Sequence, residues 1–321
     1  MNGAQALLTT LVDNGVEVCF ANPGTSEMHF VAALDAVPQM RGVLTLFEGV
    51  ASGAADGYAR MADKPAAVLL HLGPGLGNGL ANLHNARRAH TPMLVVVGDH
   101  ATYHKKYDAP LESDIDALAG TVSGWVRRTM DTGDISADAT DALAASRAGV
   151  VSTLILPADV SWTDGAGTTP RMPPAEESGV DDDAVDAVAA VLRSGEPTVI
   201  LIGGDATRSP GLAAAVRVGE ATGAQVLCET FPTRLERGAG IPSVERLAYF
   251  AEAAQEQLAG AAHLVVAGTA SPVSFFAYPG KPSNLVPADC DVHVLAPHVG
   301  AGAALERLAD DLAAGITAAL A

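Results

Sequence analysis

The sequence of 321 residues predicts an α/β protein made of two Rossmann-like domains, each with a doubly wound parallel sheet. Short β-branched runs alternate along the chain with Ala-rich helical stretches, as in repeated strand–helix units. The apolar runs lack the alternation of polar and apolar residues that marks a half-exposed strand, which indicates parallel strands covered on both faces. The length suits two domains, and a segment rich in Pro, Gly and acidic residues interrupts the pattern near its middle.

The first predicted domain covers residues 1–165 and opens with an amphipathic helix in "MNGAQALLTTLVDNG". Its predicted strands are "VEVCFANPG", "GVLTLFE", "AAVLLHLG", "PMLVVVGD" and "VSTLILPADV". The helices between these strands are "TSEMHFVAALDA", "GVASGAADGYARMA", "NGLANLHNARRA" and "DALAASRA". The first of these helices has a Ser or Thr cap and carries Glu27 in its first turn.

Residues 166–186 form the predicted linker, because they combine Pro, Gly and acidic residues without an apolar period. A second α/β domain is predicted over residues 187–321, with strands in "PTVILIGG", "AQVLCE", "HLVVAG" and "DVHVLA". Its helices are expected at about Gly211–Thr222, Val244–Leu258 and Ala303–Ala313.

The composition excludes several classes of partner. A net charge of −18 argues against binding to nucleic acid or to an anionic membrane surface. The apolar runs are of strand length, so we expect no membrane span, and the N-terminus lacks the basic region of a signal peptide. Cys19, Cys228 and Cys290 show no metal-ligand spacing and are expected to be reduced thiols, which predicts a cytoplasmic protein.

Glu48 is the sharpest candidate for a functional residue. It closes the run "GVLTLFE", so we expect it at the carboxyl end of a strand, where open α/β sheets bind their ligands. The next segment, "GVASGAADG", is packed with small residues, although each Gly inside a helix costs about 1 kcal/mol relative to Ala. Either the close approach of another backbone compensates this cost, or the segment merely packs tightly on its own sheet and Glu48 is a solvated strand end.

Two glycine-rich stretches suggest nucleotide binding, but neither fits the dinucleotide pattern. "HLGPGLGNG", His71 to Gly79, follows a strand and precedes a helix, and "LIGGDATRSPG" has the same context, yet both lack G-x-G-x-x-G. An NAD-dependent oxidoreductase is therefore disfavoured. No metal site is predicted, since His100 and His104 are expected in a loop and no carboxylate stands at ligand spacing from the other histidines.

Four segments carry a resemblance to a known family. "FANPGTSE", "FEGVASGAADGYAR", "HLGPGLGNGLANL" and "PMLVVVGDH" occur in this order over residues 1–160. They are similar to the pyrimidine-binding domain of thiamine-diphosphate enzymes of the acetolactate synthase and benzoylformate decarboxylase group. The second domain resembles the central Rossmann-like domain of that family.

The resemblance implies that Glu48 is catalytic and hydrogen-bonds N1′ of the aminopyrimidine of thiamine diphosphate. A carboxylate there favours the 4′-imino form, whose nitrogen can remove the proton from C2 of the thiazolium, and the ring then serves as an electron sink. The family also implies a homo-oligomer, a dimer or tetramer formed through the pyrimidine-binding domain. The small residues after Glu48 would then admit the partner subunit.

Further site residues are implied in the same way. His71 falls where benzoylformate decarboxylase-like enzymes have a proton-relaying catalytic histidine that also contacts substrate, although a buried histidine bonded to backbone is an equal alternative. The loop "NPGTSE" corresponds to the substrate side of the pocket. The implied substrate-binding residues are Thr25, Ser26 and His71, and the implied cofactor-binding residues are Glu48, Pro23, Gly24, Gly75 and Asn78. The segment "CETFPTRLERGAGIP" resembles the decarboxylases rather than an FAD contact, so FAD is not an expected cofactor.

The family holds the diphosphate and Mg²⁺ with a third domain that carries Gly-Asp-Gly and Asn-Asn, and neither occurs in this sequence. We therefore expect that this C-terminal diphosphate-binding domain is absent from the chain, through truncation or because a separate chain supplies it. The isolated chain is expected to be inactive.

The expected function is acetolactate synthase-like: decarboxylation and carboligation of pyruvate or another 2-oxo acid, with thiamine diphosphate and Mg²⁺. The alternatives are a benzoylformate decarboxylase-like enzyme and a non-catalytic paralogue or partner that retains the scaffold.

Overall fold

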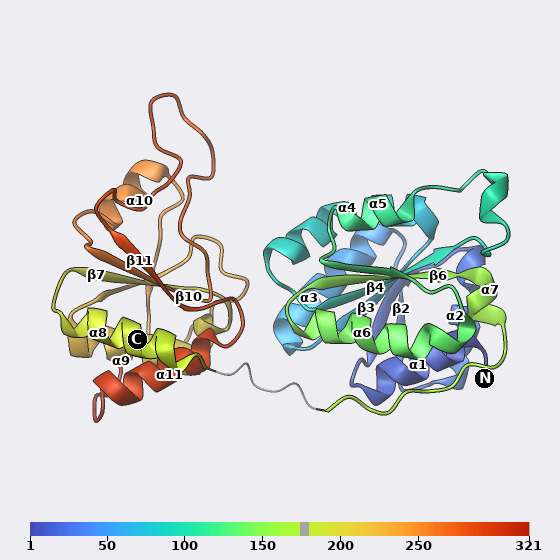
Figure 1. The fold of residues 1–321 in the computed structure, drawn as a ribbon, viewed down its shortest axis with the longest axis horizontal. Coiled ribbons are helices and arrows are strands. Elements are labelled where there is room, and N and C mark those ends of the chain that lie inside the picture. Colours follow the sequence, from blue (N-terminus) through green and yellow to red (C-terminus); the bar gives the residue numbers. More distant parts are fainter. Residues whose placement is uncertain (174–179, 321) are drawn as a thin grey trace. The chain divides into compact units, whose positions relative to one another are not determined.

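The computed structural model describes residues 1–173 and 180–320 (Figure 1). The chain divides into two compact units, Met1–Ala175 and Glu176–Ala321. Each unit contains one sheet in which every strand pair is parallel, with helices on both faces. The prediction of an α/β protein with two parallel-sheet domains is confirmed.

The sheet of the first unit has six strands in the order β2-β1-β3-β4-β6-β5. The strands are β1 (Val18–Asn22), β2 (Arg41–Leu44), β3 (Ala66–Leu70), β4 (Met93–Asp99), β5 (Trp125–Arg128) and β6 (Val151–Pro157). Every residue of β3, β4 and β6 is buried, which explains why these runs show no polar alternation in the sequence.

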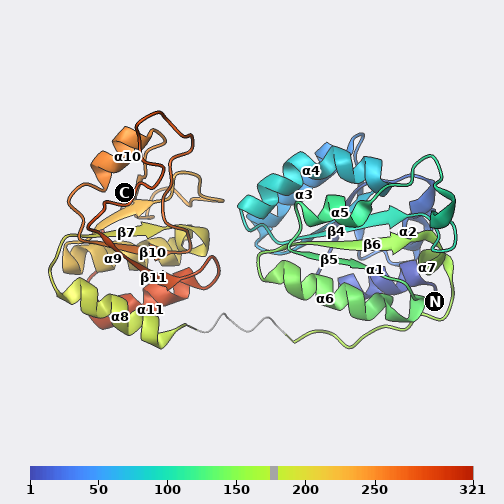
Figure 2. The same ribbon diagram turned by 45° about the horizontal axis from the view of Figure 1, so that its top comes forward.

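Helices cover both faces of this sheet and bury a separate core on each. One core is formed with α1 (Gly3–Asp13), α2 (Met28–Ala36) and α6 (Ile135–Arg147). The other is formed with α3 (Glu48–Ala62), α4 (Leu72–Arg88) and α5 (Ile115–Gly120). In Figure 2 the second group lies above the sheet and α1 and α6 lie below it. The short helix α7 (Ala158–Trp162) follows β6.

The strand order places a crevice between β1 and β3. After β1 the chain forms β2 on one side of that strand, and it then returns to form β3 on the other side. The segments that leave the carboxyl ends of β1 and β3 therefore diverge, and ligands of open α/β sheets bind at such a point. These two segments are the 3₁₀ turn Thr25–Glu27 and the start of α4 after His71.

The second unit is a smaller sheet with the order β11-β10-β7-β8-β9. Its strands are β7 (Thr198–Ile202), β8 (Gln225–Cys228), β9 (Glu245–Arg246), β10 (His263–Ala267) and β11 (Asp291–Ala296). One face is covered by α8 (Asp182–Arg193), α9 (Ser209–Thr222) and α11 (Ala301–Leu312). The opposite face is covered by α10 (Ala251–Gln257).

Several predicted elements differ in extent from the structure. The sequence missed β5, a partly exposed edge strand whose residues Arg127 and Arg128 break the apolar run. The helix expected at Val244–Leu258 was too long, because its first part pairs with β8 as strand β9 and only Ala251–Gln257 is helical.

The predicted domain boundaries stay a prediction. Helix α8 begins at Asp182, inside the range 166–186 that the sequence predicts as linker. Residues 174–179 of that range lie outside the described residues. Among the described residues, no helix has both the length and the apolar character that crossing a membrane requires.

Candidate active site

Glu48 lies at the start of a helix, so its predicted position at the end of a strand is wrong. Strand β2 ends at Leu44, and Glu48 is the first residue of α3. The intervening turn is tied to β1, because the Thr45 hydroxyl donates to the Ala21 carbonyl at 3.2 Å. Glu48 is only 8% exposed. The unsatisfied N–H groups and dipole of a helix N-terminus favour a carboxylate at this place.

The two oxygens of the Glu48 carboxylate have different surroundings. Asn78 Nδ2 donates a hydrogen bond to Oε2 at 3.0 Å. No described residue donates to Oε1, which faces Gly75: a Cβ atom added there would lie 3.1 Å from Oε1. The carboxylate is therefore held through one oxygen, while the other is kept accessible as an acceptor by the absence of a side chain at position 75.

The small residues of α3 make close contacts with α4 of the same chain. Ser52 Oγ donates to the Gly79 carbonyl at 3.3 Å, and Asn82 Nδ2 donates to the Gly49 carbonyl at 2.6 Å. A Cβ atom on Gly53 would lie 3.0 Å from Asn82 Nδ2. These contacts correspond to tight packing within one domain, one of the two explanations that the sequence leaves open.

The glycine-rich stretch after β3 is helical, not a loop that precedes a helix. Helix α4 begins at Leu72, a buried non-glycine residue in the left-handed region with φ of 47°. Such a conformation costs on the order of 1–3 kcal/mol and occurs preferentially at functional sites. Here it turns the chain sharply between His71 and the helix. A Cβ atom on Gly73 would overlap Ser113 Oγ, so this glycine admits a neighbouring loop.

His71 and Glu48 both lie next to Gly75. A Cβ atom on Gly75 would lie 3.3 Å from the Cβ of His71. His71 Nδ1 is 2.8 Å from Glu27 Oε2, and that oxygen also accepts from the Gly24 backbone N–H at 2.7 Å. The structure thus joins Glu48, His71 and Glu27 at the crevice between β1 and β3.

Sequence reasoning missed Glu27, which it treated only as a favourable acid in the first turn of a helix. Glu27 is 1% exposed and its carboxylate is hydrogen-bonded to His71, a residue 44 positions later. Acids are almost never fully buried unless they are paired, and no local sequence signal marks Glu27 as buried. Its partner could not have been identified without the fold.

The loop after β1 brings the other predicted residues to the same edge. Asn22 Nδ2 donates to the Thr45 carbonyl at 2.8 Å, which joins this loop to the turn before Glu48. Pro23, Gly24 and Ser26 are half-buried, and Thr25 is exposed. The roles of Thr25, Ser26 and Pro23 in binding stay predictions.

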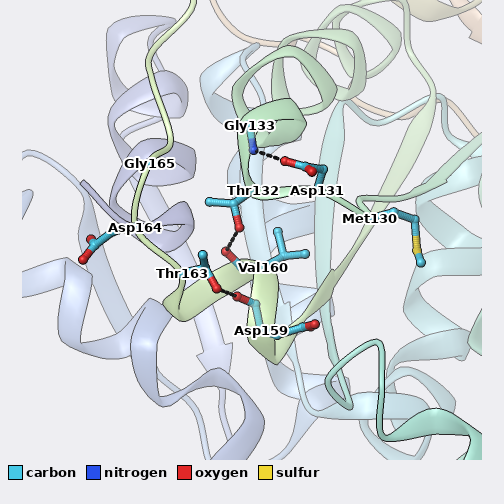
Figure 3. A pocket seen from close by; sticks show the side chains of 9 residues that line it. All are labelled: Met130, Asp131, Thr132, Gly133, Asp159, Val160, Thr163, Asp164 and Gly165. Atoms are coloured by element: carbon cyan, nitrogen blue, oxygen red, sulfur yellow. Dashed lines mark hydrogen bonds between the residues drawn. The ribbon is translucent and has the colours of Figure 1, made fainter.

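A cavity of about 310 Å³ lies elsewhere on the first unit, at the carboxyl ends of β5 and β6 (Figure 3). Two of its three acidic residues are already engaged: Asp131 Oδ1 accepts from the Gly133 N–H at 2.7 Å, and Asp159 Oδ1 accepts from the Thr102 N–H at 2.9 Å. None of the predicted site residues lines this cavity. Within the described part of the chain, no group of three His, Cys, Asp or Glu side chains could hold a metal ion.

The second unit also holds a half-buried acid at the carboxyl edge of its sheet. Glu229 follows β8 and packs against Gly203, where an added Cβ atom would overlap its Oε1. Thr269 Oγ1 lies 3.4 Å from its Oε2, and the Gly204 N–H also donates to the carboxyl group. Burial outweighs these hydrogen bonds and raises the pKa of Glu229 to about 7.

Comparison with known proteins agrees with this geometry. Residues 1–119 match the family model described as thiamine pyrophosphate enzyme, N-terminal TPP binding domain. The whole chain is 72% identical to the Mycobacterium tuberculosis protein named "Putative acetolactate synthase large subunit IlvX", of which it covers 62%. Over 85 residues, 26% of this chain and 16% of the relative, it is 39% identical to benzoylformate decarboxylase of Pseudomonas aeruginosa.

Among solved structures, the thiamine diphosphate-dependent 4-hydroxybenzoylformate decarboxylase of Rhodococcus jostii RHA1 has the same fold. The TM-score is 0.83 at 22% identity, over 98% of this chain and 62% of that one. The chain thus spans 62% of the length of both this protein and the Mycobacterium tuberculosis relative. The family match includes Glu27, Glu48, His71 and Asn78, the residues joined at the crevice. Residues 1–119 are thus similar to the N-terminal TPP-binding domain of thiamine pyrophosphate enzymes.

Proposed function

We propose that this protein takes part in thiamine diphosphate-dependent making or breaking of C–C bonds in 2-oxo acids, in the manner of an acetolactate synthase. The observation that carries the proposal is the buried Glu48 carboxylate, whose Oε1 is left as an acceptor beside Gly75 at the crevice of a TPP-binding domain. The whole-chain similarity to an acetolactate synthase-like protein supports this reaction class.

The residues present fit the aminopyrimidine half of the cofactor. When bound, thiamine diphosphate supplies an electron sink for cleavage of the bond next to the carbonyl of a 2-oxo acid. Glu48 Oε1 would accept a hydrogen bond from a protonated ring nitrogen, and Asn78 would hold the second oxygen in place. Gly75 would leave room for the ring, since a side chain there would crowd Oε1. Mg²⁺ and the diphosphate would be bound by groups outside the residues described here.

A benzoylformate decarboxylase-like reaction is the second candidate. His71 favours it, because its imidazole is hydrogen-bonded to a buried carboxylate, an arrangement suited to proton transfer. The 39% identity to a benzoylformate decarboxylase over 85 residues points the same way. Product analysis separates the two, since carboligation yields a 2-hydroxy-2-methyl-3-oxo acid from pyruvate and decarboxylation yields an aldehyde.

We expect thiamine diphosphate with Mg²⁺ to stabilise the protein in its native assembly, as measured by differential scanning calorimetry. At 100 times the dissociation constant, a specific ligand adds about 2.7 kcal/mol to the free energy of unfolding. NAD at the same concentration is the control and should leave the transition unchanged. Equal stabilisation by NAD, or no response to saturating thiamine diphosphate, would contradict the proposal.

We further propose that the protein is a cytoplasmic homo-oligomer that associates through the first unit. The apolar side chains that flank Glu48 are exposed: Leu44 by 72%, Leu46 by 93% and Val50 by 56%. Exposed apolar groups of this kind mark association surfaces. The three cysteines are free thiols, which suits a reducing compartment.

Replacing Leu46 with Asp should weaken self-association at least about tenfold, because a buried charge without a partner opposes docking. Sedimentation velocity across a concentration series measures this change. Leu320→Asp is the matched control, since Leu320 is also exposed, by 63%, but belongs to the second unit. An unchanged oligomer in Leu46→Asp would show that association uses another surface.

A further inference from the structure

Glu27 is a buried carboxylate with one oxygen committed to His71 and one without a partner. Oε2 accepts from the Gly24 N–H and lies 2.8 Å from His71 Nδ1, whereas Oε1 has no hydrogen-bond partner among the described residues. Oε1 occupies the space that a Cβ atom on Gly98 would fill. An unsatisfied buried polar atom costs about 1–3 kcal/mol, so a group that retains one calls for a compensating role.

Three features hold the His71 ring in one orientation. Its Nδ1 faces Glu27, its face packs against Gly24, and the left-handed Leu72 fixes the backbone next to it. A Cβ atom on Gly24 would lie 2.3 to 2.6 Å from three ring atoms, so only glycine allows this contact. The Glu27 side chain is 0% exposed and the His71 side chain is 22% exposed. The accessible part of the imidazole is therefore the part that points away from Glu27, towards the crevice.

We propose that Glu27 is a positioning residue for His71: its carboxylate keeps the neutral imidazole protonated on Nδ1, so that Nε2 carries the lone pair that exchanges protons with the substrate. This inference rests on the proposed function. The hydrogen bond made by one ring nitrogen decides which nitrogen of a histidine bears the proton. A carboxylate is acceptor-only, so Nδ1 must be the donor towards it.

The proton transfer balances within this pair. When a substrate hydroxyl gives its proton to Nε2, the O–H bond breaks, an Nε2–H bond forms and the ring becomes an imidazolium. The charge of the pair then changes from −1 to 0, and the Glu27 carboxylate faces a positive ring through a charge-assisted hydrogen bond. Return of the proton from Nε2 restores the starting state, with no other reactant consumed.

Long-range ¹H–¹⁵N correlation spectra of the ¹⁵N-histidine-labelled full chain test the proposal without any cofactor. The His71 signal is assigned by its loss in His71→Gln. At a pH where the imidazole is neutral, we expect His71 to be protonated on Nδ1 in the wild type. Glu27→Gln should lower that tautomer's population at least threefold, because an amide can present either a donor or an acceptor to Nδ1. Glu17→Gln, on the surface near Tyr58 and Lys64, is the control and should change nothing at His71.

Kinetics of the cofactor-loaded enzyme give the second readout. Glu27→Gln should lower kcat at least tenfold, leave KM within about threefold and alter the pH–rate profile, as loss of an oriented acid–base group does. Glu27→Asp, with a shorter carboxylate, should retain the Nδ1–H tautomer in part and recover part of kcat, and it serves if Glu27→Gln does not fold.

A wild-type His71 protonated on Nε2, or a tautomer indifferent to Glu27→Gln, would overturn the proposal. A kcat unchanged in Glu27→Gln would also overturn it, while leaving thiamine diphosphate binding intact. Failure of thiamine diphosphate to bind the wild type would instead contradict the proposed function, and the tautomer measurement would still decide on the Glu27–His71 pair.

Discussion

Glu48→Gln is expected to lower the turnover of the cofactor-loaded enzyme by at least about 100-fold. This is the loss of rate that removal of a positioned acid–base group typically causes. The amide has nearly the volume of the carboxylate and can still accept from Asn78 Nδ2, so the packing around Gly75 should survive. What it cannot do is share a proton with a ring nitrogen as a carboxylate does. The loss should therefore fall on turnover, not on the fold.

Steady-state kinetics and far-ultraviolet circular dichroism of the same preparation check this expectation together. Glu252→Gln is the matched control, because Glu252 lies on α10 of the second unit and pairs with Lys281. Turnover of Glu48→Gln within threefold of the wild type, with an unchanged spectrum, would remove Glu48 from the reaction.

Glu229→Gln is expected to change the pH dependence of stability in the second unit. Burial holds the pKa of Glu229 at about 7 in the folded chain, against 4.5 for a solvent-exposed glutamate. Between pH 4.5 and 7 the unfolded chain loses this proton while the folded chain keeps it, so the free energy of unfolding falls as pH rises through that window. The accumulated loss is roughly 3 kcal/mol above pH 7. The stabilising contribution is complete only below pH 4.5.

In Glu229→Gln this loss should be absent, because the amide does not titrate and can still accept from the Gly204 N–H. The variant should thus be more stable than the wild type above pH 7 and nearly equal to it at pH 4. Scanning calorimetry over pH 4–8 measures the transition of the second unit, and the transition of the first unit in the same trace is the internal control. Parallel pH curves for wild type and variant would contradict the prediction.

The sequence was sufficient to predict the sheets because their strands are buried on both faces. The run of β3 consists wholly of Ala, Val and Leu, and that of β4 begins with Met-Leu-Val-Val-Val, as is typical of covered parallel strands. Strand β5 escaped detection because an edge strand needs no apolar run, and Arg127 and Arg128 give it a polar surface. The predicted start of helix α4 was too late, because the Gly and Pro residues in its first turns are poor helix formers. They are tolerated where neighbouring groups require small side chains.

The candidate site was predictable only in part. Glu48, His71, Gly75 and Asn78 could be selected through the resemblance of four motifs to a known family, and the structure places these four residues around Gly75. Glu27 was beyond reach, since its role depends on a hydrogen bond to His71, and the strands that precede these two residues are neighbours only in the folded sheet. The position of Glu48 on a helix rather than a strand likewise follows from the Thr45 turn, whose contact to β1 is not local in sequence.

A co-crystal structure of the native assembly with thiamine diphosphate and Mg²⁺ tests the central claim most directly. The account predicts the aminopyrimidine ring in the crevice between β1 and β3, with a ring nitrogen at about 2.7–3.2 Å from Glu48 Oε1 and Gly75 against its edge. Glu48→Gln, crystallised in the same way, should lose or displace the ring. An aminopyrimidine bound elsewhere, or Glu48 Oε1 turned away from it, would contradict the assignment of this site.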